Sequence, residues 1–562
     1  MSLDGSANDI FAGGDSDSSA PRRPELESSP SDEVDVKGRN GPRSRAGCFT
    51  CRTKKVKCDE EKPTCRRCIR LKMFCDYAPR ARRRRTVHRP HNPAPVELAQ
   101  PANSASSLEL TAADHEAIRF YRTTFAKIHH TKSADFSLYA IIFKLAESEP
   151  MIMRVILALG GKEIELRSGR PGHDQLRAIT PVRHHYLAVK MMQEALRQSG
   201  PENSKPADLD VICAALYLML LYEEKHGDSK SDALKYHLDA AAPLLQHLCS
   251  QSSLKMAITV PEKFENKVAL NRNRQPGEEP GQLSLFSARL MVYLSLHDSA
   301  ASTFGLGGKL NAALNDIRAK FDPNAKFMDG ADSLHRYSYA LYRLMWGNQY
   351  PQNELIDDIE NRHIYSLRLA ASQLRFRVAQ VAKLDPATAQ EQASSLHDAF
   401  QLVEYRFGEM LGIASDLGIK TDNTRRIVGN IRGIVPHFYA AVLEFQRLGR
   451  HSGFEVRRPP TENPIRSIMN LVQQAYKHEG NDAMTRIAWP LFVVALETDD
   501  DNDRDWILAR FESMKTYGKN YERSHRYLDE TISLKRSSKI GSRGKRPCND
   551  RFETADGELF VI

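Results

Sequence analysis

The sequence lacks the long apolar stretches that membrane-spanning and secreted proteins carry. Its longest apolar run, Val211 to Tyr222, is about half the length that a bilayer-spanning helix needs. The N-terminal residues contain neither the basic start nor the apolar stretch of a signal peptide. We therefore expect an intracellular protein that does not bind membranes.

Patterns typical of β-strands, phosphate loops and catalytic sites are scarce as well. Alternating apolar and polar residues and hairpin dipeptides are rare, which disfavours a large sheet. Gly305 to Lys309 resembles a phosphate loop, but Thr303 stands where the first glycine belongs and Leu310 follows the lysine. No nucleophile and base can be paired from the sequence, so we predict that the protein is not an enzyme.

Histidine gives no clear metal site. The adjacent pairs His129–His130 and His184–His185 fall in segments with helical patterns. Neighbouring side chains on a helix diverge, so we do not expect the two members of either pair to bind one ion.

Cysteine and positive charge are sparse over most of the chain and concentrated in one short segment. Six of the nine cysteines lie between residues 48 and 75. Residues 43–85 carry a net charge of +12, whereas the other 519 residues carry −3. Clustered thiols in a reducing compartment bind metal more often than they form disulfides. The excess positive charge is typical of a module that binds a polyanion.

The rest of the chain divides into regions of distinct composition. With 562 residues it is long enough for about two to four structural units. Residues 1–44 are rich in Ser, Asp, Gly and Pro, and we expect them to be disordered. Residues 80–110 combine a basic run with several prolines, which predicts a linker without continuous helix. The cysteine module occupies residues 45–79.

Residues 111–535 have apolar residues at helical spacing and predict a large all-α domain. Ile118, Tyr121 and Phe125 fall on one stripe, and Asp208 is expected to cap the helix that follows it. Further helices are expected at Ile152–Leu159, Tyr186–Leu196, Leu209–Glu224, Leu234–Leu248, Leu285–Leu296, Ile356–Leu384 and Ile427–Leu448.

The tail, residues 536–562, is expected to be flexible. From Asp550 onward, acidic residues alternate with aromatic and aliphatic ones. Such a segment can present hydrophobic anchors to a coactivator, which would make it an activation segment. The alternative is a frayed or docked terminus without that role.

The spacing of the cysteines is typical of zinc binding. Successive cysteines are separated by two, six, six, two and six residues. Each two-residue interval lets a pair of thiolates bind one ion, and each six-residue interval leaves room for a short helix. Six thiolates can fill two four-coordinate sites only if two sulfurs are shared. The cysteines are Cys48, Cys51, Cys58, Cys65, Cys68 and Cys75.

This pattern resembles the fungal binuclear zinc cluster family of transcription factors, in every cysteine interval over about thirty residues. The resemblance implies two Zn²⁺ ions bridged by Cys48 and Cys65. The remaining ligands would be Cys51 and Cys58 for one ion, and Cys68 and Cys75 for the other. Because so small a module has almost no apolar core beyond residues such as Val56 and Leu71, zinc would supply its folding free energy.

The resemblance also implies contacts to double-stranded DNA. In family members the end of the helix between the second and third cysteines enters the major groove, where a lysine binds the guanines of a CGG triplet. The matching positions are Lys54 and Lys55, whose donors suit the O6 and N7 acceptors of guanine. The other basic side chains are expected to contact phosphate, which gives affinity without sequence information. They are Arg52, Lys57, Arg66, Arg67, Arg70 and Lys72.

The basic run after the module predicts a nuclear import signal, and it would add phosphate contacts. The alternative is a solvated basic segment without either role. Its arginines are Arg80, Arg82, Arg83, Arg84 and Arg85. With the resemblance, it predicts a nuclear regulator that acts at RNA polymerase II promoters.

The residues after the module do not contain the coiled coil by which many relatives dimerise. They hold several prolines and no sustained heptad. This leaves open a monomer on a single triplet and a homodimer formed through the helical region. That region resembles the middle regulatory domain of the same family, which implies transcriptional coregulators and, in some members, a small-molecule effector. No residue pattern in this sequence identifies such an effector.

Two other classes of function remain open. The first is a zinc-stabilised scaffold whose basic module binds acidic proteins or RNA. The second is an enzyme with an appended DNA-binding module, which needs a catalytic site that the sequence does not show. A preference for CGG-containing DNA over other DNA would separate the first class from a transcription factor.

Overall fold

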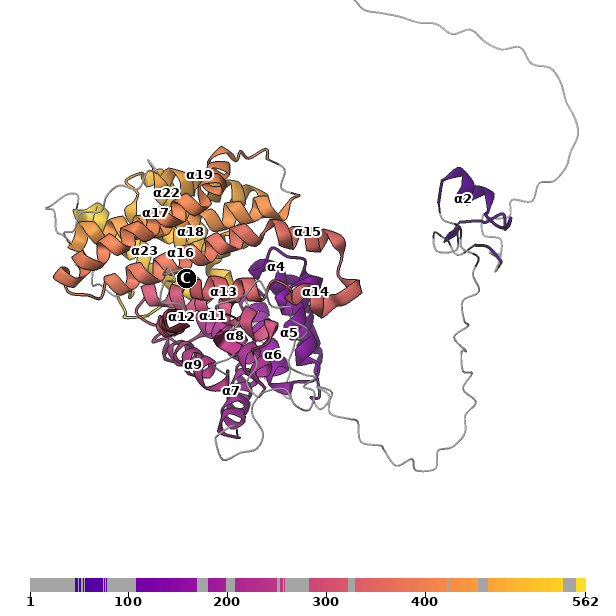
Figure 1. The fold of residues 1–562 in the computed structure, drawn as a ribbon, viewed down its shortest axis with the longest axis horizontal. Helices are drawn as coiled ribbons and strands as arrows, with labels where there is room; N and C mark the ends of the chain where they lie inside the picture. Colours follow the sequence, from indigo (N-terminus) through magenta and orange to yellow (C-terminus); the bar gives the residue numbers. More distant parts are fainter. Residues whose placement is uncertain are drawn as a thin grey trace, which may run out of the picture. The chain divides into compact units, whose positions relative to one another are not determined.

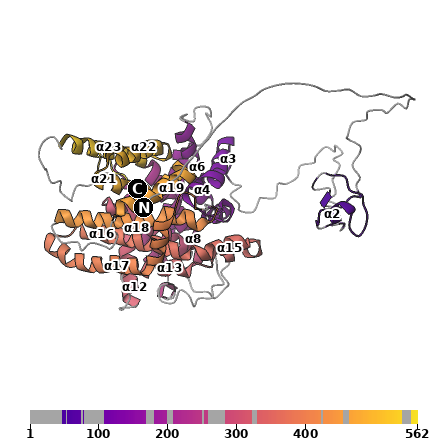
Figure 2. The ribbon, with the colours of Figure 1, turned by 90° about the horizontal axis from the view of Figure 1, so that it is seen from above.

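The computed structural model describes two compact units, one within residues 1–98 and one within residues 99–562 (Figures 1 and 2). We call them the cysteine unit and the helical unit. The described residues are 46–48, 50–51, 54, 56–73, 75, 77, 108–168, 180–198, 208–249, 253–255, 257, 283–321, 329–421, 424–452, 463–538 and 552–562. The predicted disordered segment 1–44 and the basic run Arg80–Arg85 lie outside them.

The cysteine unit contains the helix α2 (Arg66–Arg70) and a helical turn at Thr50 and Cys51. Lys54 N donates to Thr50 O, and Val56 N donates to Cys51 O, so this turn ends near Val56. The helix predicted after the second cysteine is therefore short, and Lys57 lies beyond it.

The first helix of the helical unit, α3, is capped by Thr111, whose side chain forms a reciprocal pair of hydrogen bonds with Asp114. Short π- and 3₁₀-helical segments occur at η2 (Tyr121–Phe125) and η3 (Ala134–Phe136). The first helices are α3 (Ala112–Phe120), α4 (Ala126–His129), α5 (Leu138–Ala146), α6 (Pro150–Ser168), α7 (Pro181–Gln198), α8 (Leu209–His226), α9 (Asp232–Leu248), α11 (Leu285–Thr303) and α12 (Lys309–Phe321).

The later helices include the longest ones. They are α13 (Asp329–Tyr337), α14 (Leu341–Trp346), α15 (Gln352–Glu360), α16 (Arg362–Val381), α17 (Pro386–Asp416), α18 (Arg426–Ser452), α19 (Pro464–Glu479), α20 (Asn481–Arg486), α21 (Ala488–Glu497), α22 (Asp501–Met514) and α23 (Lys519–Ser538). The 3₁₀ segments η5 (Gly347–Gln349) and η6 (Lys515–Tyr517) lie between them. Within the described residues the only β pairing is one isolated bridge between Glu553 and Leu559.

Helix α8 lies at the centre of one half of the helical unit. Every residue from Leu209 to Glu223 is buried, because α6, α9, α11 and α23 pack around it. Its N-terminus is capped by Asp208, which accepts a hydrogen bond from Asp210 N (2.9 Å). No described helix has the length and apolar character needed to span a membrane.

The other half is a layer of long helices in which α16, α17 and α18 run side by side (Figure 1). Helices α19 and α21 pack on α18. The single helix expected over Ile356–Leu384 is two helices, α15 and α16, which meet at Asn361. The buried Asn361 side chain donates to Asp357 O and accepts from Asn430 Nδ2, so its amide takes part in tertiary contacts at the break.

Residues 552–562 pack against the helical unit, which differs from the flexible tail expected from the sequence. The Phe552 and Phe560 rings contact Phe304, Phe492 and Tyr527. The backbone is also held, since Leu559 N donates to Ser229 O (2.8 Å). The aromatic residues that suggested an activation segment fill a part of the core in this structure.

Candidate metal centre

The sulfurs of the cysteine unit form two groups of four. In each group all Sγ atoms lie within 4.8 Å of one another. The groups are Cys48, Cys51, Cys58, Cys65 and Cys48, Cys65, Cys68, Cys75. They share Cys48 and Cys65, whose Sγ atoms are 3.8 Å apart.

The distances between sulfurs fit tetrahedral zinc. A Zn–S bond of about 2.3 Å places two sulfurs of one tetrahedron about 3.8 Å apart. Cys48 Sγ lies 3.8 Å from Cys68 Sγ, and Cys51 Sγ lies 3.8 Å from Cys65 Sγ. A disulfide would bring two sulfurs to about 2.05 Å. The six thiols therefore suit two ions that share two ligands.

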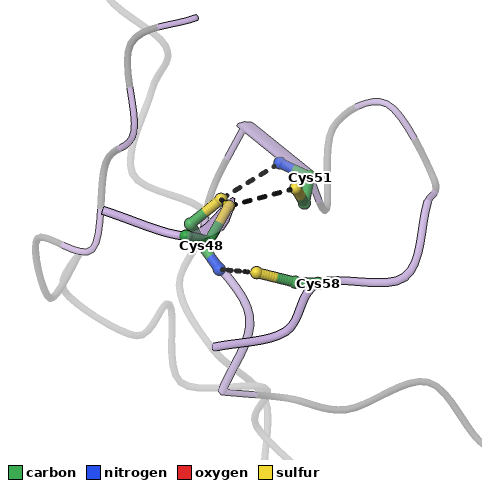
Figure 3. A group of neighbouring side chains, drawn as sticks. Cys48, Cys51 and Cys58 are labelled. Carbon is green, nitrogen blue, oxygen red and sulfur yellow. Dashed lines mark hydrogen bonds between the residues drawn. The ribbon is translucent and has the colours of Figure 1, made fainter. Parts of the chain in front are cut away.

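The first half of the centre is built by backbone amides that donate to sulfur (Figure 3). Cys51 N donates to Cys48 Sγ (3.4 Å), and Cys48 N donates to Cys58 Sγ (3.4 Å). Glu60 N donates to Cys58 Sγ as well (3.4 Å). These donors stabilise the thiolate form, which is the form that binds metal.

The second half repeats these contacts around Cys65, which lies 17 positions after Cys48. Cys65 is the N-cap of α2, and its Sγ accepts from Cys68 N (3.4 Å). Cys65 N donates to Cys75 Sγ (3.3 Å). Each shared sulfur therefore accepts an amide at the start of a helical turn, and each shared cysteine donates to the last cysteine of its own half.

The electrostatics of the sulfurs favour a bound cation. The N–H group of Cys68 lowers the pKa of Cys65, whereas desolvation raises the pKa of Cys51 to about 12. Thiols so close together do not all ionise on their own, because each thiolate repels the next. Two divalent ions would remove that penalty and displace the remaining protons.

Tyr77 and Met73 belong to the centre, although the sequence pattern did not identify them. The Tyr77 hydroxyl lies 3.5 Å from Cys58 Sγ, and Lys62 Nζ lies 5.9 Å from the centre of the Tyr77 ring. Val56 and Met73 pack on the cysteines, as expected for Val56. Leu71 does not pack there, because 47 % of it is exposed. An aromatic residue two positions after the last cysteine is the sequence signal that would have pointed to Tyr77.

Most of the basic residues expected to contact DNA lie on the surface of the cysteine unit. Lys54, Lys57, Arg70 and Lys72 are exposed, and Arg67 is half-buried. Arg52 and Lys55 lie outside the described residues.

Arg66 differs from the other exposed basic residues. It donates two hydrogen bonds to Glu61, from Nε (2.7 Å) and from Nη2 (2.6 Å). This carboxylate competes with phosphate for the guanidinium group.

Two family profiles match the chain, and together they cover more than half of it. Residues 46–85 match the fungal Zn(2)-Cys(6) binuclear cluster domain. Residues 118–347 and 434–531 match the fungal specific transcription factor domain. The first match contains the whole metal centre, and the second covers most of the helical unit.

Several curated relatives are transcription regulators. The aspercryptin biosynthesis cluster-specific transcription regulator atnN of Emericella nidulans is 26 % identical over 206 residues, which is 32 % of this chain and 31 % of that protein. Transcriptional regulator alnR of the same fungus is 39 % identical over 67 residues (12 % and 16 %). Transcription factor lfc1 of Flammulina velutipes is 51 % identical over 49 residues (8 % and 17 %). The matches thus span less than a third of each relative. No solved structure is significantly similar to the chain.

Proposed function

Because the chain belongs to the fungal-specific transcription factor family and carries its Zn(2)-Cys(6) cluster, we propose that it binds specific DNA sequences and regulates transcription by RNA polymerase II in the nucleus. The family consists of transcription factors, so the chain is not an enzyme. The observation that carries the proposal is the pair of four-sulfur groups that share two cysteines, beside a surface of exposed lysines and arginines.

In this proposal the cluster holds two zinc ions. Cys48 and Cys65 bridge them, Cys51 and Cys58 complete one site, and Cys68 and Cys75 complete the other. The ions cross-link the two halves of a unit that has little apolar core. The amides that donate to sulfur fix the helical turn after Cys48 and the start of α2.

Lys54 and Lys55 read the DNA sequence, and the other basic residues bind phosphate. Lys54 lies in the turn that begins at Thr50, and its side chain is exposed. Lysine amines there would donate to guanine O6 and N7 in a CGG triplet. Arg52, Lys57, Arg70 and Lys72 contribute charge, whereas Arg66 binds phosphate only by sharing or releasing Glu61.

The remaining parts of the proposal concern localisation and partners. Arg80, Arg82, Arg83, Arg84 and Arg85 act as the import signal and add phosphate contacts. The helical unit binds transcriptional coregulators. It is also the region through which a homodimer would form, since no heptad repeat follows the cysteine module.

A cavity in the helical unit suits an acidic small molecule as effector. Its lining includes Arg289, Arg368 and Arg486 but no aspartate or glutamate. Among the described residues, Arg289 and Arg368 have no carboxylate partner. Leu296 and Ile434 make part of the cavity wall apolar. An organic carboxylate is therefore the class of ligand that fits, because it offers a negative charge to the arginines and an apolar body to this wall.

The experiment that tests the main proposal is selection of DNA from a randomised double-stranded library by the full chain at physiological salt. We expect enrichment of a CGG motif, present once for a monomer and twice for a dimer. Lys55→Ala and treatment with a chelator should remove the enrichment, whereas Lys62→Ala, outside the reading turn, should keep it. Enrichment of no sequence would contradict the proposal and favour a zinc scaffold that binds polyanions through charge alone.

A further inference from the structure

Three side chains from consecutive helices bring metal-binding atoms together in the helical unit. They are His185 of α7, Glu223 of α8 and His237 of α9. One ligand atom from each lies within 4.8 Å of the other two. Apart from the cysteines, this is the only group of its kind in the described part of the chain.

The group is buried and lacks the partners that buried polar side chains normally have. Only 9 % of Glu223 and 6 % of His237 are exposed. Buried His185 Nε2 has no hydrogen-bond partner. A buried carboxylate without a cation and a buried imidazole nitrogen without a partner each cost free energy.

The basic residues nearby do not neutralise Glu223. Lys225 Nζ lies 2.5 Å from Glu163 Oε1, and Lys162 Nζ lies 2.9 Å from Glu165 Oε2. Among the described residues, no lysine or arginine forms an ion pair with Glu223. The site therefore has an uncompensated carboxylate and two imidazoles.

The distance between His185 and Glu223 matches a coordination edge better than a hydrogen bond. His185 Nε2 and Glu223 Oε1 are 3.4 Å apart, which is longer than the usual N–H···O distance of about 2.9 to 3.0 Å. Two ligand atoms about 2.1 Å from one zinc ion in a tetrahedral arrangement are about 3.4 Å apart. The His185 ring is also held in place, since it stacks on Tyr222 at 4.1 Å and 13°.

We propose that His185, Glu223 and His237 bind a third zinc ion, independent of the cysteine cluster. Two imidazoles and one carboxylate form a recurrent zinc donor set that leaves a fourth position for water. The ion neutralises the buried carboxylate and joins α7, α8 and α9. The ion would stabilise the packing of α7 most, because the other face of this helix is exposed to solvent at Val182 and Tyr186.

The test is the zinc content of the full chain, purified with zinc and freed of loose metal by gel filtration. We expect about three ions per folded chain. His237→Gln and Glu223→Gln should each lose one ion and keep two. His247→Gln, an exposed histidine on the same helix, should keep three. Circular dichroism would verify that the variants retain their helices.

The cysteine cluster and the third site give separate results. Cys48→Ser with Cys65→Ser should remove two ions and leave one, whereas His237→Gln should remove one and leave specific DNA binding by the cluster. Two ions per folded wild-type chain, or a third ion that survives both His237→Gln and Glu223→Gln, would overturn the proposal. Neither outcome would affect the assignment of the cluster.

Discussion

Replacing Phe560 by alanine should detach residues 552–562 from the helical unit. Phe560 is 1 % exposed, and its ring centroid lies 5.2 Å from that of Phe304, 5.8 Å from Phe492 and 5.7 Å from Tyr527. Removing a buried phenylalanine side chain costs about 3–5 kcal/mol. The backbone hydrogen bonds of the segment hold it less firmly once this ring is gone.

The size of the effect on thermal unfolding follows from the size of the unit. An unfolding entropy of roughly 2.1 cal/mol/K per residue gives about 0.8 kcal/mol/K for about 400 residues. A loss of 3–5 kcal/mol then lowers the unfolding temperature by about 4–6 °C. If residues 552–562 detach before the rest of the unit unfolds, the decrease in unfolding temperature is smaller, because the free energy with which this segment docks limits it.

Thermal unfolding and limited proteolysis of the full chain would measure this effect. Phe560→Ala should lower the unfolding temperature and expose residues 552–562 to protease, whereas Asp556→Asn, at an exposed position, should behave as wild type. If the detached segment acts as an activation segment, Phe560→Ala should also raise reporter output. Equal unfolding temperatures and equal cleavage of the segment in wild type and Phe560→Ala would refute the docking argument.

Three further predictions concern the cluster and the cavity. Cys65→Ser removes a ligand shared by both ions, so metal analysis should show the loss of both ions and specific DNA binding should cease. Specific DNA binding by this variant would contradict the bridging assignment. Lys54→Ala should reduce the preference for CGG by about 1–3 kcal/mol in competition binding. Lys72→Ala should weaken binding to all DNA sequences equally and lower the slope of log affinity against log salt concentration by about 1. Identical changes in the two variants would contradict the division of roles. Millimolar benzoate, but not benzamide, should raise the unfolding temperature, and Arg368→Gln should abolish this difference between the two compounds. Equal effects of the acid and the amide would argue against an acidic effector.

The cysteine unit was largely predictable because its fold depends on local spacing. The intervals between cysteines indicated two ions with two shared sulfurs, and the family resemblance implied that Cys48 and Cys65 are the shared ones. The structure places the sulfurs in two groups that share these two cysteines. The position of Leu71 was not predictable in the same way. Whether an apolar side chain packs depends on which neighbours face it, and in so small a unit the sulfurs occupy the interior.

The helical unit was predictable in class but not in its contacts. The cap at Asp208 and the continuous apolar run of α8 follow local rules. The break at Asn361 and the docking of Phe560 depend on partners far away in sequence, which periodicity does not reveal.

The adjacent histidines show how a correct local rule can miss a site. The side chains of His184 and His185 do diverge, as expected. His184 Nε2 lies 3.1 Å from Asp114 Oδ1 on α3, whereas His185 faces Glu223 on α8. Each histidine thus finds a partner on a different helix, and the second partner leads to the zinc site that we propose.

The repeated contacts in the two halves of the cysteine unit have a consequence for how its surface is used. Equivalent cysteines lie 17 positions apart, so Lys54 in the first half corresponds to Leu71 in the second, and both side chains are exposed. Ile69, beside Leu71, is 60 % exposed. The same backbone arrangement thus presents Lys54 in one half, and the apolar Ile69 and Leu71 beside the basic Arg70 and Lys72 in the other. If Lys54 binds DNA as proposed, the exposed Ile69 and Leu71 leave the second half with apolar side chains that remain available to a protein partner of the DNA-bound regulator.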